Sequence, residues 1–490
     1  MNAGMQADAY SKLTCLNWGL FAAASIAICV AAASLITGSG VRKDAAQNVR
    51  MAVNFEHLGV VSNNLDSPYR PSMYREPSPI LVDAVGVAFT DRILGPAAFS
   101  AYLDGKRVRF IKLQNVFWIL LLWLSVFAAT HTLTKSFYLA MGAGIIAVVP
   151  FLSGTKVEGV NGLYTELPGA ALLCAAAFAL AVAATDGKTW KFALAGASFG
   201  CLVLTKASFL YVCACLFVLL AAMSLRRRDE RRKHLLQLVL LAASFLAIVL
   251  PWIGRNVHTF GEAQVSERGG LAVYTRALMN EMSPTEFRGT FYVWARPKVQ
   301  PFMGSMLGFT EADLRPGGRL QRLNTDADSK SFNSDLAAEL EGRPQDAVTF
   351  YRRGRAERER LETIFQREGV LDPDVASDRA LTAKGMAMVE SAPLRDLALT
   401  VPLLWRSALL VFPIFLLGLG YALWTGSERL LLYAFPGFAY LCFYAVITPF
   451  EPRPAVIARA LAIVAVAPVI QRLARACREA VRLEIYRTPY

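Results

Sequence analysis

Charged side chains stand at the ends of several apolar segments of this 490-residue chain. Two of them are carboxylates and three are cations: Asp44, Glu166, Lys206, Arg255 and Arg453. A carboxylate at a membrane boundary can act as a general base or as a metal ligand. Grouped cations can hold a phosphate through charge-assisted hydrogen bonds. Together, at one face of a membrane, the five would suit an anionic, phosphate-bearing ligand.

Each of these residues also has a simpler structural explanation. Asp44 opens a predicted short helix and can serve as its N-cap. Glu166 begins an apolar segment, where a negative charge is favourable at a helix N-terminus. Lys206 and Arg255 can extend their charged ends towards lipid headgroups, and Trp252 fits the aromatic belt of a membrane boundary. Position alone leaves the chemical and the structural explanations open.

Other catalytic templates are absent from the sequence. It contains no phosphate-binding GxxxxGK[ST] loop, no HExxH zinc motif and no GxSxG turn with triad partners. The four histidines lack metal-ligand spacing: His57, His131, His234 and His258. Nearly all cysteines lie inside apolar runs and none lies in the long polar segments, which argues against a disulfide framework or a structural zinc site: Cys15, Cys29, Cys174, Cys201, Cys213, Cys215, Cys442 and Cys477.

The composition indicates which kind of elements hold these residues. Hydrophobic residues make up 55% of the chain and charged residues 18%, whereas soluble domains are about one-quarter charged. The apolar residues form long runs, which indicates an all-α polytopic membrane protein and excludes a disordered chain, a fibre and a cytosolic globule. The net charge of +13 does not indicate nucleic-acid binding, because the densest basic run, 226–233, lies between apolar runs and no basic stripe carries stacking aromatics.

Hydropathy predicts about ten transmembrane helices. Their predicted ranges are 16–37, 112–133, 137–153, 166–184, 190–206, 207–225, 234–252, 407–424, 429–448 and 454–470. A weaker amphipathic segment, 79–94, is broken by charges and is predicted to be an interfacial helix rather than a span.

The Lys and Arg bias of the short loops predicts the orientation. The run 226–233 and the basic C-terminal tail are expected in the cytosol, as is the N-terminus. Three segments then face the other side: an external loop at 38–111 with juxtamembrane helices, a short loop at 153–165, and a large, mostly helical polar segment at 254–400. The chain divides accordingly into a transmembrane module with the external loop, the polar segment, and C-terminal transmembrane helices with the tail: 1–253, 254–400 and 401–490.

The order of motifs resembles the GT-C superfamily of membrane glycosyltransferases. The closest branch contains the dolichyl-phosphate-mannose protein mannosyltransferases and the lipid A aminoarabinose transferases. The elements that match the family, in chain order, are an acidic stretch from Asp44 through Ala52 to Gly59, Arg75-Glu76-Pro77-Ser78-Pro79, Thr165-Glu166, Leu204-Thr205-Lys206, the full P-W-x-x-R-N-x-x-x-F-G motif from Pro251 to Gly261, and Glu451-Pro452-Arg453. Asn48 and Pro454 stand where the family has aromatic residues.

The resemblance implies a GT-C fold and a sugar donor carried on a polyprenyl phosphate. It implies that Asp44 is the general base on the acceptor hydroxyl and that Glu166 orients the acceptor or a cation. The leaving phosphate needs cations as its charge develops, and the implied ones are Lys206, Arg255 and Arg453. Further contacts to substrate are implied for Arg75, Glu76, Asn256 and Glu451. Some family members use a divalent cation near the first acid and others do not, so no cofactor is assigned.

The expected function is therefore transfer of a hexosyl or pentosyl group, with inversion, to an envelope lipid, glycan or protein. A lipopolysaccharide component is one such acceptor. The expected location is the bacterial inner membrane, with both termini cytosolic and the active site periplasmic. Two alternatives stay open: a transporter or flippase of lipid-linked sugars, and a non-catalytic envelope assembly protein. The sequence names neither the sugar nor the acceptor.

Overall fold

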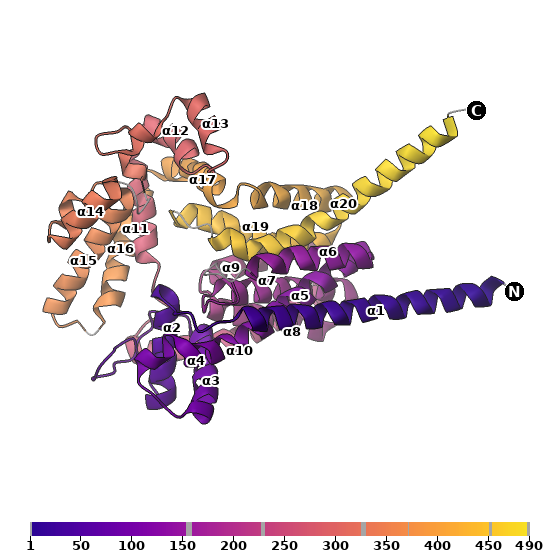
Figure 1. Cartoon of the computed structure of the whole chain (residues 1–490), viewed down its shortest axis with the longest axis horizontal. Helices are drawn as coiled ribbons and strands as arrows, with labels where there is room; N and C mark the ends of the chain where they lie inside the picture. Colours follow the sequence, from indigo (N-terminus) through magenta and orange to yellow (C-terminus); the bar gives the residue numbers. More distant parts are fainter. Residues whose placement is uncertain are drawn as a thin grey trace.

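The computed structural model describes residues 2–152, 159–226, 231–324, 330–370, 372–449 and 453–487. Within these ranges every regular element is a helix, as the sequence predicts. The helices of the apolar bundle are α1 (Asn2–Leu35), α5 (Gln114–Thr134), α6 (Phe137–Val148), α7 (Glu166–Asp186), α8 (Thr189–Thr205), α9 (Phe209–Arg226), α10 (Arg231–Phe260), α18 (Val411–Thr425), α19 (Glu428–Ile447) and α20 (Arg453–Arg487). Figure 1 shows them side by side, with α1 and α20 projecting from one end.

The bundle helices differ in length. Six segments of the described chain are long and apolar enough to cross a membrane: Cys15–Leu35, Gly105–Thr134, Glu166–Asp186, Arg232–Phe260, Glu428–Ile447 and Arg453–Val481. A bent pair, α17 (Pro393–Ala408) and α18, would make a seventh, and three apolar helices are shorter. The 17-residue α8 rises only about 26 Å, less than the ~30 Å hydrocarbon core. The chain is a multi-pass membrane protein, and its predicted ten crossings stay a prediction.

Glycines allow the closest helix contacts in the bundle. A Cβ on Gly196 of α8 would lie 2.1 Å from the Leu241 carbonyl oxygen of α10. One on Gly200, a turn later, would lie 2.7 Å from Ile248 Cβ. Small residues at such spacing let two backbones approach, which is how apolar helices gain contact where no hydrophobic effect drives them together.

The first loop, residues 38–111, forms a small helical layer at the end of the bundle opposite the projecting ends of α1 and α20 (Figure 1). Its helices are α2 (Lys43–Leu58), α3 (Pro77–Leu94) and α4 (Gly105–Lys112), with a 3-10 turn at Phe99–Tyr102. Gly59 ends α2 in the left-handed conformation that glycine favours, and Pro77 opens α3 at a position that needs no amide hydrogen. One face of α3 is apolar and exposed, as the prediction of an interfacial helix requires.

The insert, residues 261–410, runs from the end of α10 to the start of α18. Its helices are α11 (Gly270–Leu278), α12 (Pro284–Val293), α13 (Gln300–Leu307), α14 (Lys330–Leu340), α15 (Phe350–Arg367), α16 (Pro373–Ser391) and α17 (Pro393–Ala408). Short 3-10 turns stand at Met279–Glu281, Glu311–Leu314, Gln321–Leu323 and Pro344–Asp346. The insert has its own hydrophobic core and lies at the same end of the bundle as the first loop (Figure 1).

Candidate active site

Asp44 lies in the first turn of α2 but is not its N-cap. The N-cap is Arg42, and no side chain caps the helix there. Lys43 has a φ of 51°, a left-handed value that is uncommon for a residue with a side chain. The chain therefore enters α2 through a sharp turn directly before Asp44. Since the Asp44 carboxylate does not cap its own helix, it is available to other segments.

Three arginines from three distant segments meet at this carboxylate. Arg75 Nη2 donates to Asp44 Oδ1 at 2.9 Å, and Arg268 Nη2 donates to Oδ2 at 2.6 Å. Arg453 Nη1 lies 3.4 Å from the same Oδ2. Arg75 precedes α3, Arg268 precedes α11 in the insert, and Arg453 begins α20. The tertiary structure thus gathers cations around Asp44 that are up to 409 positions away in the chain.

Glu166 is the second acid of the cluster. It is the first residue of α7 and is only 1% exposed. Its Oε1 lies 3.9 Å from Arg453 Nη1, so one guanidinium stands between the two carboxylates. The same guanidinium lies 5.2 Å from the centre of the Tyr164 ring. The sequence-predicted acids Asp44 and Glu166 and the predicted cation Arg453 are thus brought together.

The charges of this cluster shift the pKa values of Asp44, Arg75 and Arg268. Burial alone would raise the pKa of the Asp44 carboxyl, but the charges and hydrogen bonds of Arg268 and Arg75 outweigh it and hold that pKa well below its usual range. Burial and the nearby charge of Arg268 lower the pKa of Arg75. Burial also opposes the charge on Arg268, yet Asp44 and Glu76 raise its pKa. Asp44 is therefore ionised, and its negative charge is neutralised by its neighbours.

Arg75 is fixed by α2 itself. Its Nε donates to Gln47 Oε1 at 2.9 Å, and its Nη2 contacts the same oxygen. Gln47 lies three residues after Asp44 on α2. Both side chains therefore accept hydrogen bonds from the Arg75 guanidinium on the same face of the helix. The side chain of Arg75 is almost fully buried. We did not predict Gln47, although its spacing from Asp44 is a signal that the sequence carries.

The P-W-x-x-R-N motif supports the cluster without touching Asp44. Arg255 Nη1 donates to the Ser72 carbonyl at 3.2 Å, and its guanidinium packs against the Trp252 and Phe260 rings. Asn256 Nδ2 donates to the Gln264 carbonyl at 2.7 Å. The motif therefore holds the segment that leads to Arg75 and the segment that leads to Arg268. The predicted direct roles of Arg255 in phosphate binding and of Asn256 in substrate binding stay predictions.

Glu76 and Lys206 lie beside the cluster. Glu76 is the N-cap residue of α3, and its Oε1 accepts a hydrogen bond of 3.4 Å from the Ala207 amide. Lys206 ends α8, and its Nζ lies 5.8 Å from the centre of the Tyr444 ring. Glu76 thus joins the first loop to the turn that carries Lys206. The predicted substrate contact Glu451 lies outside the described residues.

Arg268 is a second residue of the site, besides Gln47, that sequence reasoning missed. It lies seven positions after the P-W-x-x-R-N-x-x-x-F-G motif, in a segment for which the sequence offers no pattern. Its neighbour Glu267 is held by α16, because Arg379 Nη2 donates to Glu267 Oε2 at 3.0 Å. Glu267 also donates its amide to the Met73 carbonyl at 3.1 Å. These contacts set Arg268 against the first loop.

Among the described residues, the side chains around Asp44 do not form a donor set for a divalent cation. No group of three or more His, Cys, Asp or Glu side chains that could hold a metal occurs among the described residues. Both oxygens of Asp44 pair with guanidinium groups, and Glu166 faces Arg453. A dication bound here would be repelled by three positive charges. We therefore derive no chemical step through a metal.

Comparison with known proteins gives one match. No protein-family model matches the chain, and no curated protein does. Among solved structures it is similar to the archaeal oligosaccharyltransferase AglB from Archaeoglobus fulgidus, in complex with an inhibitory peptide and a dolichol-phosphate. The TM-score is 0.42 and the sequence identity 15%, over 93% of this chain and 52% of that chain. The chain thus spans about half the length of that structure.

Proposed function

We propose that the chain is a membrane glycosyltransferase of the GT-C type that takes a sugar from a polyprenyl-phosphate donor. The observation that carries the proposal is the group of Arg75, Arg268 and Arg453 around Asp44 at the first-loop end of an apolar bundle. A base beside several cations suits a reaction in which a hydroxyl is deprotonated and a phosphate leaves. The order of sequence motifs supports the same reaction class.

In the proposed reaction, the arginines exchange Asp44 for the donor phosphate as their hydrogen-bond partner. When a lipid phosphate enters, its oxygens compete with Asp44 for the guanidinium groups, since both are anions of suitable geometry. Asp44 then loses part of the stabilisation that lowers its pKa and becomes a better proton acceptor. Without a phosphate ligand, the arginines keep Asp44 neutralised and weakly basic.

The bond changes follow from this exchange. Asp44 accepts the proton of the acceptor hydroxyl as that oxygen attacks the anomeric carbon of the donor. The bond from the anomeric carbon to the phosphate oxygen breaks, and the arginines stabilise the negative charge left on the lipid phosphate. Attack opposite the leaving group inverts the configuration. Glu166 orients the acceptor or keeps Arg453 in place.

The proposed setting is the periplasmic face of a bacterial inner membrane. There the donor is a polyprenyl-phosphate hexose or pentose, and the acceptor is an envelope lipid, glycan or protein. The first-loop end of the bundle would then face the lipid-linked donor directly, and no nucleotide is needed.

Asp44→Asn tests the proposal. It keeps the shape of the side chain, and an amide cannot accept the proton as a carboxylate does. A deletion strain is complemented with the wild-type gene, with Asp44→Asn, or with the control Asp104→Asn, an exposed acid of the same loop. We expect mass spectrometry of envelope glycolipids and glycoproteins to show one sugar lost in the deletion, restored by the wild type and by the control, and not restored by Asp44→Asn at matched protein level. Full restoration by Asp44→Asn would overturn the proposal and favour a transporter or an assembly protein.

A further inference from the structure

Helix α17 lies across the direction of the bundle. It ends at Ala408, and α18 begins at Val411, with an angle of 103° between the two. Helix α18 packs in the bundle against α19 and α20. If α18 runs roughly along the membrane normal, the nearly perpendicular α17 must run roughly in the membrane plane. Figure 1 shows α17 at the first-loop end of α18.

The outward face of α17 is apolar rather than polar. Leu394, Leu397 and Val401 are all exposed, and their spacing of three and four residues places them on one face. Leu394 is 81% exposed. The opposite face is buried in the insert through Leu399 and Leu403. Since a surface helix normally turns polar residues outward, this face is built to contact something apolar.

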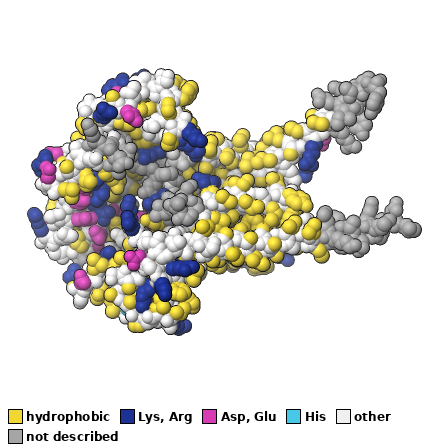
Figure 2. All heavy atoms as spheres, viewed as in Figure 1, with side chains coloured by type: hydrophobic (Ala, Val, Ile, Leu, Met, Phe, Trp, Pro, Cys, Tyr) yellow, Lys and Arg dark blue, Asp and Glu magenta, His cyan; other side chains and the backbone are white. Residues whose placement is uncertain are grey.

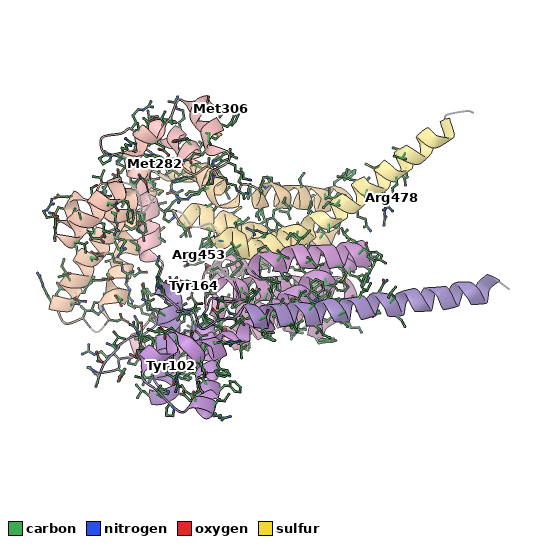
Figure 3. All side chains as sticks on the ribbon, in the orientation of Figure 1. Tyr102, Tyr164, Met282, Met306, Arg453 and Arg478 are labelled. Carbon is green, nitrogen blue, oxygen red and sulfur yellow. The ribbon has the colours of Figure 1, made fainter. Side chains whose placement is uncertain are left out.

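A second helix of the insert presents the same kind of face. On α13, Phe302 is 67% exposed, and Met306, one turn later, is exposed as well. Between them, Met303 is buried in the same core as Leu399 and Leu403. Helix α12 packs against both α13 and α17. Figure 3 shows Met306 at the edge of the insert, and Figure 2 shows hydrophobic atoms on the side of this lobe that faces the bundle.

Helix α3 marks the membrane boundary on the other side of the bundle. Its residues Leu81, Val85, Phe89 and Ile93 recur every four positions and are exposed, Val85 at 71%. This apolar stripe is typical of a helix that lies in a membrane interface. In Figure 1, α3 lies at the same end of the bundle as α13 and α17, on its opposite side. The apolar faces of α3, α13 and α17 are consistent with contact to the same leaflet of the bilayer.

We propose that the insert is seated on the lipid bilayer through an apolar face, here called the lipid seat, formed by Phe302, Met306, Leu394, Leu397 and Val401. The occupant is the leaflet on the side of the first loop. Lipid is favoured because α17 continues directly into α18, so the seat is continuous with the lipid-facing surface of the bundle. The insert is thereby held by lipid as well as by its contacts with the first loop and by its two chain connections.

The lipid seat is linked to the candidate active site through buried charges. Arg276 Nη1 of α11 donates to Asp396 Oδ1 of α17 at 2.9 Å, and both side chains are buried. Helix α11 begins at Gly270, two residues after Arg268. The amide of Gly270 donates to Asp378 Oδ2 at 2.7 Å. Seating α17 on lipid therefore positions α11, the helix that directly follows Arg268. The lipid seat itself does not depend on the proposed enzymatic activity.

Photocrosslinking tests the lipid seat. A benzophenone amino acid replaces Phe302 or Leu394, and, as a control, Leu340 of α14, which is 79% exposed and lies outside the seat. The full-length protein is irradiated in nanodiscs of phosphatidylethanolamine and phosphatidylglycerol and analysed by mass spectrometry. We expect phospholipid adducts at 302 and 394 at a yield several-fold above that at 340.

Three outcomes would overturn the proposal. One is the absence of phospholipid adducts at 302 and 394, and another is an equal yield at all three positions. The third is a crosslink at 302 and 394 to a second copy of the chain, which would make the face a subunit contact. Each variant is compared with the wild type by size-exclusion chromatography, so that a misfolded protein is not scored.

Discussion

At the residue scale, the main feature of the candidate site is the excess of cations around the Asp44 carboxylate. Asp44 is paired with Arg75 and Arg268, and Arg453 lies between it and Glu166. Such a carboxylate is a poor base until another anion takes over its partners. The arrangement thus favours proton transfer only with an anionic ligand present.

Replacing Arg268 with glutamine tests its contribution to the positive charge around Asp44. The change removes one cation that would stabilise a leaving phosphate, and loss of one such donor typically costs about 10²- to 10³-fold in rate. We expect kcat/KM for transfer from a polyprenyl-phosphate sugar to fall by about that factor. Arg367→Gln, an exposed residue of α15, is the matched control and keeps wild-type activity. Wild-type kcat/KM in Arg268→Gln would show that Arg268 does not contribute to the reaction.

Asp83 of α3 links stability to pH. Its Oδ1 accepts from Gln114 Nε2 at 2.6 Å, while its buried Oδ2 has no hydrogen-bond partner among the described residues. Burial raises its pKa to about 7. The folded protein therefore holds this proton more tightly than the unfolded chain, whose Asp pKa is about 3.9, so stability falls as pH rises from about 4 through 7.

We expect the wild-type Tm in detergent to be lower at pH 8 than at pH 5, with Asp83 contributing to the difference. Asp83→Asn has no charge to bury and keeps an oxygen that can accept from Gln114. The variant should show a smaller decrease and a higher Tm than the wild type at pH 8. Thermal unfolding monitored by intrinsic fluorescence measures both, and an unchanged pH dependence in Asp83→Asn would contradict the argument.

At the element scale, helix contacts in the bundle depend on particular glycines. Gly196 stands where α8 meets the backbone of α10, whereas a Cβ on Gly142 of α6 would have no atom within 4 Å. Both glycines are helical and lie in apolar segments. They therefore form a matched pair of positions, of which only Gly196 is in tight contact with a neighbouring helix.

Gly196→Ala should destabilise the bundle, and Gly142→Ala should not. The added methyl group at 196 must push α8 and α10 apart, and overpacking of this kind costs about 1–3 kcal/mol. We expect a lower Tm and a lower yield of monodisperse protein in detergent for Gly196→Ala. At 142 the alanine raises helix propensity and meets no neighbour. Equal behaviour of the two variants would mean that α8 and α10 do not approach as described.

At the scale of the whole molecule, the insert and the first loop complete one site from opposite directions. The insert provides Arg268, the first loop provides Asp44 and Arg75, and the last bundle helix provides Arg453. Contacts such as Asp372 Oδ2 with Ser72 Oγ, at 3.4 Å, join the insert to the loop. The site is therefore sensitive to how the insert is held.

The buried pair Arg276 and Asp396 tests that dependence. Arg276→Met leaves Asp396 buried without its ionic partner, which costs about 3–5 kcal/mol. The double change Arg276→Met with Asp396→Leu removes both charges and should recover much of the lost stability. We expect Tm to fall strongly in the single variant and less in the double variant. A double variant as unstable as the single one would show that the stability comes from shape rather than from charge pairing.

Much of the architecture could be predicted from the sequence, because hydrophobic length and period determine where helices form in a membrane protein. The predicted interfacial segment 79–94 lies within α3 (Pro77–Leu94). Several boundaries differ, including the two where the bundle meets the insert. Helix α10 continues to Phe260, beyond the predicted end at 252, and α18 begins at Val411 after the sharp bend from α17. Hydropathy does not register either feature, since a helix can leave the apolar layer or turn without a change of pattern.

Local composition and motif order are enough to predict the membrane class, the helical elements and the candidacy of Asp44, Glu166 and Arg453. Which charges meet depends on the tertiary structure. It brought Arg268 to Asp44 and assigned Arg255 and Asn256 contacts that hold neighbouring segments. The physical reason is that an ion pair is a matter of distance in space, and segments hundreds of positions apart come together only when the bundle, the first loop and the insert pack against one another.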